Sequence, residues 1–172
     1  MNEDSSPTDK TISMFDVKKT RGTAQKWFLN KKDYEHDKQM CCVKQIFENN
    51  INKNDENLCN IMKQQIQQKI NGYRSQDIQK SLYKDTDFVD FEHVLNLMME
   101  CQNVCYYCKN QVYVLYEIVR EPKQWSLERI DNKIGHDRGN VVIACLNCNL
   151  RRKTMYHERF AFTKQLNIIK KH

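Results

Sequence analysis

Two pairs of cysteines near the C-terminal end of the chain have the spacing of a metal site. Two residues separate Cys105 from Cys108, and two residues separate Cys145 from Cys148. Each C-x-x-C pair can present two thiolates to one ion, and two pairs complete the tetrahedral four-cysteine site that Zn²⁺ favours. No secretion signal precedes them, so disulfides are not expected. The sequence therefore predicts one structural zinc ion held by four thiolates.

The basic residues gather in the same part of the chain. The 172 residues carry a net charge of +6, whereas residues 101–172 alone hold 13 Lys and Arg against 6 Asp and Glu, a net charge of +7. Concentrated positive charge is typical of a protein that binds a polyanion, most often nucleic acid, although a well-solvated surface has the same composition. No apolar run reaches the roughly 18 residues of a membrane helix. The N-terminus also lacks the pattern of a signal peptide, so we expect an intracellular protein with no membrane partner.

The first part of the chain is polar and irregular, so residues 1–22 are expected to form a flexible segment. The hydrophobic periodicity that follows predicts a helical region, residues 23–100. A first helix is expected at 23–49. A second should run from a cap at Asn54 or Asp55 to a cap at Gly72, a third should cover 76–83, and a fourth should follow an N-cap at Asp90. This helical region has no charge bias and is a candidate docking surface for a protein partner.

In residues 101–172 runs of β-forming residues replace the helical pattern, and this change predicts a small zinc-braced domain. Residues 112–119, 125–130 and 140–144 are rich in β-forming side chains, and a loop dense in turn residues joins the last two runs. A helix opened by Asn149 and a last amphipathic stretch at 160–169 should follow. The predicted fold class is therefore α+β, with the helices first and the zinc domain second.

The order of these motifs resembles the His-Asn-His (HNH) endonuclease family, in particular its four-cysteine zinc branch in phages and large DNA viruses. The likeness is carried by Cys105-x-x-Cys108, Leu127-Glu128-Arg129-Ile130-Asp131, Gly135-His136, Gly139-Asn140-Val141-Val142 and Cys145-x-x-Cys148-Asn149 with Lys153. It covers about residues 105–153 and extends weakly upstream through Tyr73-x-x-Gln76-Asp77.

The resemblance implies a ββα-metal fold braced by a treble-clef zinc, with a second divalent ion, Mg²⁺ or Mn²⁺, at the catalytic site. That ion would stabilise the charge that develops on a cleaved phosphodiester of DNA. A viral origin would extend the expected location from cytoplasm or nucleus to the virion. The basic side chains expected on phosphates are Arg129, Arg138, Arg151, Arg152 and Lys153.

The resemblance also assigns roles to individual residues. Glu128 matches the metal-binding carboxylate, and Asn149 matches the final metal ligand. Asn140 matches the residue that pins the loop to the strand. Asp131 matches a position that can face the site. Arg129 stands where the general-base histidine is usual.

Arg129 departs from the family at the point that decides the chemistry. Its guanidinium has a pKa above about 12 and cannot accept a proton near neutral pH, but it can clamp a phosphate oxygen. The candidates for the base are then Asp131, His136 and a hydroxide supplied by the divalent ion. Three functions follow. The protein is a metal-dependent DNA endonuclease, or a non-catalytic zinc module that kept the fold, lost the base and binds nucleic acid or a protein assembly, or a purely structural zinc protein within a larger particle or complex.

Overall fold

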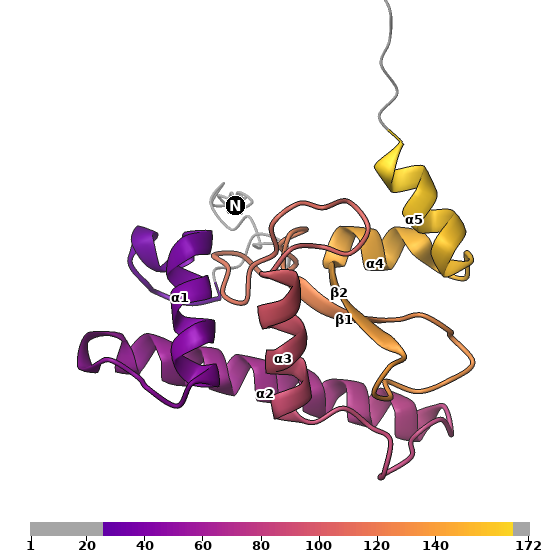
Figure 1. The fold of residues 1–172 in the computed structure, drawn as a ribbon, viewed down its shortest axis with the longest axis horizontal. Helices are drawn as coiled ribbons and strands as arrows, with labels where there is room; N and C mark the ends of the chain where they lie inside the picture. The colour runs from indigo at the N-terminus through magenta and orange to yellow at the C-terminus, as the bar shows by residue number, and fades with distance from the viewer. Residues whose placement is uncertain (1–25, 167–172) are drawn as a thin grey trace, which may run out of the picture.

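The computed structural model describes residues 26–166, which form a mixed α+β fold, as predicted. Figure 1 shows α2 lying along one side, with α1 across its first half, α3 near its middle and the two-stranded hairpin toward its second half. The elements are η1 (Lys31–Tyr34), α1 (His36–Phe47), η2 (Lys53–Asp55), α2 (Glu56–Gln79), α3 (Phe91–Cys101), β1 (Trp125–Arg129), β2 (Val141–Cys145), α4 (Leu146–Arg152) and α5 (His157–Gln165). The flexible segment predicted at 1–22, and the end of the stretch at 160–169, lie outside the described residues.

The long helix α2 differs from the sequence prediction. We expected Gly72 to end one helix and a second helix to follow, but α2 runs unbroken through Gly72 to Gln79. The helix continues past Gly72 because its later turns are held by contacts with a distant part of the chain. Lys69, Tyr73 and Asp77 recur every four residues, so they lie on one face of the helix, and all three contact the hairpin region. We call these three residues the α2 seam.

The seam joins the helical region to the strands through polar contacts. The ammonium group of Lys69 donates to the Gln124 side chain at 3.1 Å and to the carbonyl of Trp125. The Tyr73 hydroxyl accepts the backbone N–H of Leu127 at 3.1 Å, on the edge of β1 that does not face β2. The seam thereby supplies partners to backbone groups that the two-stranded sheet leaves unpaired.

The strand predicted at 112–119 is wrong. This segment forms no strand, although Val114 and Leu115 are fully buried. The buried side chain of Gln39, on α1, takes the place of a neighbouring strand. Its carbonyl oxygen accepts the N–H groups of Val114 at 2.8 Å and Leu115 at 3.0 Å, and its amide donates to the Leu115 carbonyl at 2.9 Å. Backbone hydrogen bonds to Asn103, Lys123 and Trp125 serve Val112 and Tyr113, and Gln39 serves Val114 and Leu115, so these groups are paired without a continuous strand.

The hairpin and the helix after it position the later cysteines. β1 pairs antiparallel with β2 in a register that sets Trp125 opposite Cys145 and Arg129 opposite Val141. The predicted helix start at Asn149 is wrong, because α4 begins at Leu146 directly after β2. The Cys145 thiol caps this helix by accepting the Cys148 N–H at 3.3 Å. The helix expected at 23–49 is also divided, into η1 and α1.

The helical region and the strands share one hydrophobic core. Val94 and Met98 of α3 belong to the same buried cluster as Trp125 and Leu127 of β1 and Ile143 of β2. The predicted N-cap of α3 is confirmed, since the Asp90 carboxylate accepts the His93 N–H at 2.7 Å. Among residues 26–166, no helix has the length and apolar character needed to cross a membrane.

The seam makes a testable prediction about stability. Tyr73→Phe removes the oxygen that accepts the N–H of Leu127, a residue that is 1% exposed. Leaving a buried N–H without a partner costs about 1–3 kcal/mol, so the free energy of unfolding measured in urea should fall by that amount. Tyr83→Phe is the matched control, because the Tyr83 hydroxyl donates to the exposed Asp85. It should change the unfolding free energy by less than about 0.5 kcal/mol.

Candidate functional site

Four thiols converge at the start of the hairpin region. The sulfur atoms of Cys105, Cys108, Cys145 and Cys148 all lie within 4.8 Å of one another, and those of Cys108 and Cys145 are 3.9 Å apart. A tetrahedral ion with bonds of about 2.3 Å requires sulfur separations of about 3.8 Å. The cluster therefore fits a metal ion. It is the only convergence of three or more His, Cys, Asp or Glu ligand atoms found within residues 26–166.

The local backbone explains how each pair of cysteines is formed. After the first pair, Lys109 adopts a left-handed conformation with a φ of 58°, and its N–H donates to the Cys105 carbonyl at 3.0 Å. The second pair spans the junction of β2 and α4, where the helix cap brings Cys148 back toward Cys145. Hydrogen bonds among the thiols lower the pKa of Cys105 and raise the pKa values of Cys145 and Cys148, so these three groups titrate together. A metal ion binds the thiolate form, so its binding would displace the protons that the thiols share.

A groove of about 630 Å³ opens beside the hairpin. It lies between the C-terminal end of α2, the strand β1 and the helix α4. Among its lining residues are Lys80, Glu128, Arg129, His136, Asn149 and Lys153. Five of these six residues were predicted from the sequence as catalytic or phosphate-binding residues, and Lys80 is the sixth, which was not predicted.

His136 is held rigidly in the groove wall although it comes from a loop. It is 4% exposed, and its Nδ1 lies 2.8 Å from Oδ1 of Asp77, which is fully buried. The other oxygen of Asp77 accepts the backbone N–H of His136 at 2.6 Å. Burial lowers the pKa of His136 and Asp77 opposes this shift. The imidazole therefore favours its neutral form near pH 7, with Nε2 free of the carboxylate.

Asn149 lines the groove, and its amide nitrogen is hydrogen-bonded to β1. Its amide nitrogen donates to the Ser126 hydroxyl at 3.2 Å and more weakly to the Leu127 carbonyl at 3.4 Å. No hydrogen bond from residues 26–166 engages its side-chain oxygen. The orientation of the amide is therefore fixed, and its oxygen is the atom left for a ligand.

Glu128 also lines the groove but forms a buried ion pair. Its Oε1 accepts a hydrogen bond from Arg152, and both side chains are less than a tenth exposed. Burial raises the pKa of Glu128, and the Arg152 charge opposes that rise. Arg152 also donates to the Ile130 carbonyl at 2.7 Å. One carboxylate oxygen remains for a ligand, so any cation here would have few protein ligands, which is common for Mg²⁺.

Apart from Glu128, the charged residues that line the groove are three cations, Lys80, Arg129 and Lys153. The Arg129 guanidinium donates to the Ile134 carbonyl at 3.1 Å, which holds it against the loop. Lys80 and Lys153 are exposed at the ends of α2 and α4. Because Glu128 is paired with Arg152, and Asp77 lies behind His136, these three cations give the groove a positive potential that suits phosphate.

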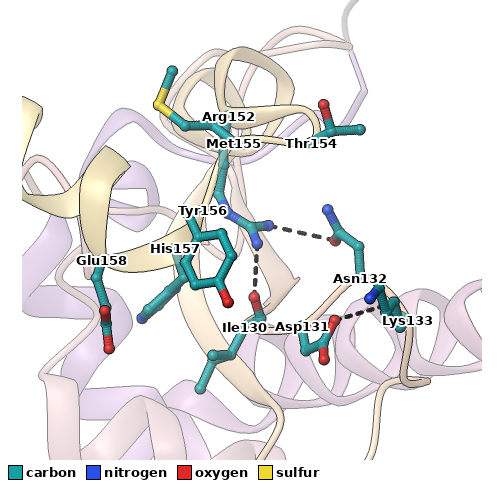
Figure 2. A pocket seen from close by; sticks show the side chains of 10 residues that line it. All are labelled: Ile130, Asp131, Asn132, Lys133, Arg152, Thr154, Met155, Tyr156, His157 and Glu158. Carbon is teal, nitrogen blue, oxygen red and sulfur yellow. Dashed lines mark hydrogen bonds between the residues drawn. The ribbon is translucent and has the colours of Figure 1, made fainter.

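Other residues selected from the sequence lie outside the groove. Asp131 and the buried Arg152 line a neighbouring pocket of about 410 Å³, shown in Figure 2. There the Asp131 carboxylate folds back onto the Lys133 N–H at 2.9 Å (Figure 2). Arg138 pairs with Asp90, at the start of α3, and Arg151 is exposed on α4.

Asn140 has a structural position at the base of the loop that carries His136. Its amide oxygen accepts the Asp131 N–H at 2.9 Å. Its amide nitrogen donates to the carbonyls of Asp131 at 3.0 Å and Gly135 at 2.8 Å. Three hydrogen bonds from one side chain thus join the two ends of the loop.

The sequence offered Tyr73, Gln76 and Asp77 only as a weak upstream extension of the resemblance. It did not predict that Tyr73 and Lys80 line the groove or that Asp77 contacts His136. The available signal was the helical spacing of Lys69, Tyr73 and Asp77, but polar residues at such positions normally mark a solvent-exposed face. The sequence contained no sign that this face packs against a strand. Comparison with protein-family models, with curated protein sequences and with solved structures found no significant match.

The thiol cluster predicts a tightly bound metal. Purified protein should hold one metal ion per chain by elemental mass spectrometry, and Cys148→Ser should lose it because three ligands bind far more weakly than four. Cys41→Ser, at an exposed cysteine on α1, is the control and should keep full metal content. Metal-free wild-type protein with unchanged folding would contradict a structural role.

The ion pair predicts that alanine substitutions of two adjacent arginines, Arg152 and Arg151, lower the unfolding free energy by very different amounts. Arg152→Ala leaves the buried Glu128 carboxylate without its partner, so the unfolding free energy should fall by about 3–5 kcal/mol. Arg151→Ala removes an exposed side chain and should change it by less than about 0.5 kcal/mol. Equal effects of the two changes in urea unfolding would mean that the ion pair does not support the fold.

Proposed function

We propose that this protein is a metal-dependent endonuclease that hydrolyses phosphodiester bonds in DNA. The observation that carries the proposal is the groove, which brings together a carboxylate, an amide oxygen and a neutral imidazole among three cations. These groups match the needs of phosphodiester hydrolysis: cations bind the phosphates, oxygens hold a divalent ion, and the imidazole can take a proton.

In this proposal the four-thiolate cluster holds a structural Zn²⁺ within a treble-clef, ββα-metal unit. The cluster has the donor set and the spacing for that ion. A Mg²⁺ or Mn²⁺ ion bound by Glu128 and Asn149 would stabilise negative charge on the reacting phosphate. Arg129, Lys80 and Lys153 would hold the flanking phosphates and thereby set the position of the strand in the groove.

A second function is favoured by one observation, the pairing of Glu128 with Arg152. If that ion pair persists when nucleic acid binds, Glu128 is a poor metal ligand and the groove binds DNA without cutting it. Three cations on phosphates predict a slope of about −3 when the logarithm of the binding constant is plotted against the logarithm of salt concentration. In this alternative, Asn149→Ala leaves binding unchanged and no divalent ion produces cleavage.

The two functions are separated by a nicking assay on supercoiled plasmid with Mg²⁺ or Mn²⁺. The wild-type protein should convert the plasmid to its nicked form. Asn149→Ala should lower the rate by at least about 10- to 100-fold, the loss typical of residues that support a metal site. Asn147→Ala is the matched control, since Asn147 lies on the same short helix and is exposed away from the groove. Wild-type protein that cuts no DNA with either ion would overturn the endonuclease proposal.

A further inference from the structure

We propose that His136 is the general base of this reaction and that Asp77, on α2, is its positioning residue. The inference deepens the proposed function and rests on it. It assigns the proton-accepting role to a loop residue, because Arg129 occupies the strand position where the general-base histidine is usual. It also makes the helical region a part of the active site, because Asp77 comes from that region.

The contacts between these two residues fix the state of the imidazole. An ionised carboxylate can only accept hydrogen bonds, so Nδ1 of His136, 2.8 Å from Asp77, must carry the proton. Its Nε2 is then the unprotonated nitrogen, and His136 lines the groove. The second hydrogen bond, from the His136 backbone to Asp77, holds the main chain as well as the ring. This is how a carboxylate orients a catalytic histidine.

Two neighbours hold the pair in place. The Tyr73 ring lies 4.5 Å from the His136 ring, centroid to centroid, and tilts from it by 33°. Gly135 allows the loop to approach α2, because a Cβ there would lie 2.7 Å from the Leu82 carbonyl oxygen and 2.9 Å from an Asp77 oxygen. A side chain at position 135 would therefore clash with the Asp77 carboxylate that contacts the imidazole, and the Tyr73 ring packs against the imidazole.

The charges around His136 suit a base near neutral pH. Burial disfavours the protonated imidazole and Asp77 stabilises it, whereas the charges of Arg129 on β1 and Lys80, just after α2, disfavour it. Asp137, the next residue, is also buried, and Glu128 is held by Arg152. The imidazole can therefore accept a proton during the reaction and release it afterwards.

The chemical step involves one water and one phosphodiester. Nε2 of His136 takes a proton from the water as its oxygen bonds to phosphorus, and one ester P–O bond breaks. The leaving oxygen takes a proton from solvent, and His136 later returns its own proton to solvent. The products are a phosphomonoester and an alcohol, so atoms and charges balance.

Plasmid nicking by zinc-loaded protein tests the role of His136. His136→Gln can still donate a hydrogen bond to Asp77 but has no basic nitrogen, so its kcat should fall by on the order of 10²- to 10⁴-fold. Added imidazole should restore part of the activity of His136→Ala and none of that of Asn149→Ala. His93→Gln, on α3, is the control and should cut at the wild-type rate. A His136→Gln variant that nicks normally would overturn this inference and leave the proposed function standing.

The pH dependence of kcat tests Asp77. In the wild type, activity should fall at low pH as Nε2 becomes protonated. Asp77→Asn removes a charge that raises the pKa of His136, so the fall in kcat at acid pH should move to lower pH. The maximum kcat should also fall, because the imidazole is no longer held in position. Asp55→Asn is the matched control, because Asp55 is a buried helical-region carboxylate paired with Lys38. It should leave the pH profile unchanged, and an equal displacement in both variants would overturn the role of Asp77.

A measurement on the wild-type protein keeps the inference testable if Asp77→Asn does not fold. Nitrogen-15 NMR of the histidine rings reports which imidazole nitrogen carries the proton. The Nδ1–H form is expected for His136 at neutral pH, and the Nε2–H form would overturn the inference. Absence of any wild-type nicking would overturn both the inference and the proposed function, whereas normal nicking with the wrong tautomer would overturn the inference alone.

Discussion

The α2 seam is the contact on which the rest of the molecule depends. A two-stranded sheet is too small to stand alone in water, since it leaves backbone groups unpaired along both edges. Lys69, Tyr73 and Asp77 lie one helical turn apart, and each satisfies a group near the hairpin: the Trp125 carbonyl, the Leu127 N–H and the His136 backbone and ring. The same helix face that stabilises the hairpin therefore forms one wall of the groove.

Cys145 links the metal cluster to that groove. It is the last residue of β2, its thiol caps α4, and its sulfur belongs to the four-thiol cluster. Because α4 starts at this fixed point, Asn149 is placed one turn later, next to Ser126 of β1. A metal at the cluster would thus hold the orientation of Asn149 without contacting it, which is the usual part played by a structural ion.

The balance of charge in the groove follows from two buried carboxylates. The Glu128 charge is balanced by Arg152, whereas Asp77 is fully buried against the neutral His136, so neither carboxylate is exposed to the groove as a free negative charge. Exposed Lys80 and Lys153 and the half-buried Arg129 then dominate the potential. Burying an ion pair costs desolvation energy, and one consequence of the pair here is that the Glu128 carboxylate has a fixed position. A local positive groove of this kind favours contact with a few phosphates over a broad coating of DNA.

The sequence by itself determined the features that depend on short-range spacing. The two C-x-x-C pairs indicated a four-cysteine cluster, Asp90 indicated the start of α3, and the alternation of strand and turn residues indicated the hairpin. These signals are reliable because a helix cap or a chelating pair is formed by residues that are neighbours in the chain.

The tertiary structure decided the features that depend on contacts between distant residues. Residues 112–119 have strong β-propensity but form no strand, and at the buried Val114 and Leu115 a glutamine on α1, 75 positions before Val114, supplies the hydrogen bonds. The α2 helix continues past Gly72, because the hairpin contacts its last turns. Asp77 reaches His136 across 59 residues, and Arg152 reaches Glu128 across 24. Propensity and spacing are local quantities, whereas the partner of a buried polar group is set by packing, and so the chemistry of this groove was readable only once the chain was folded.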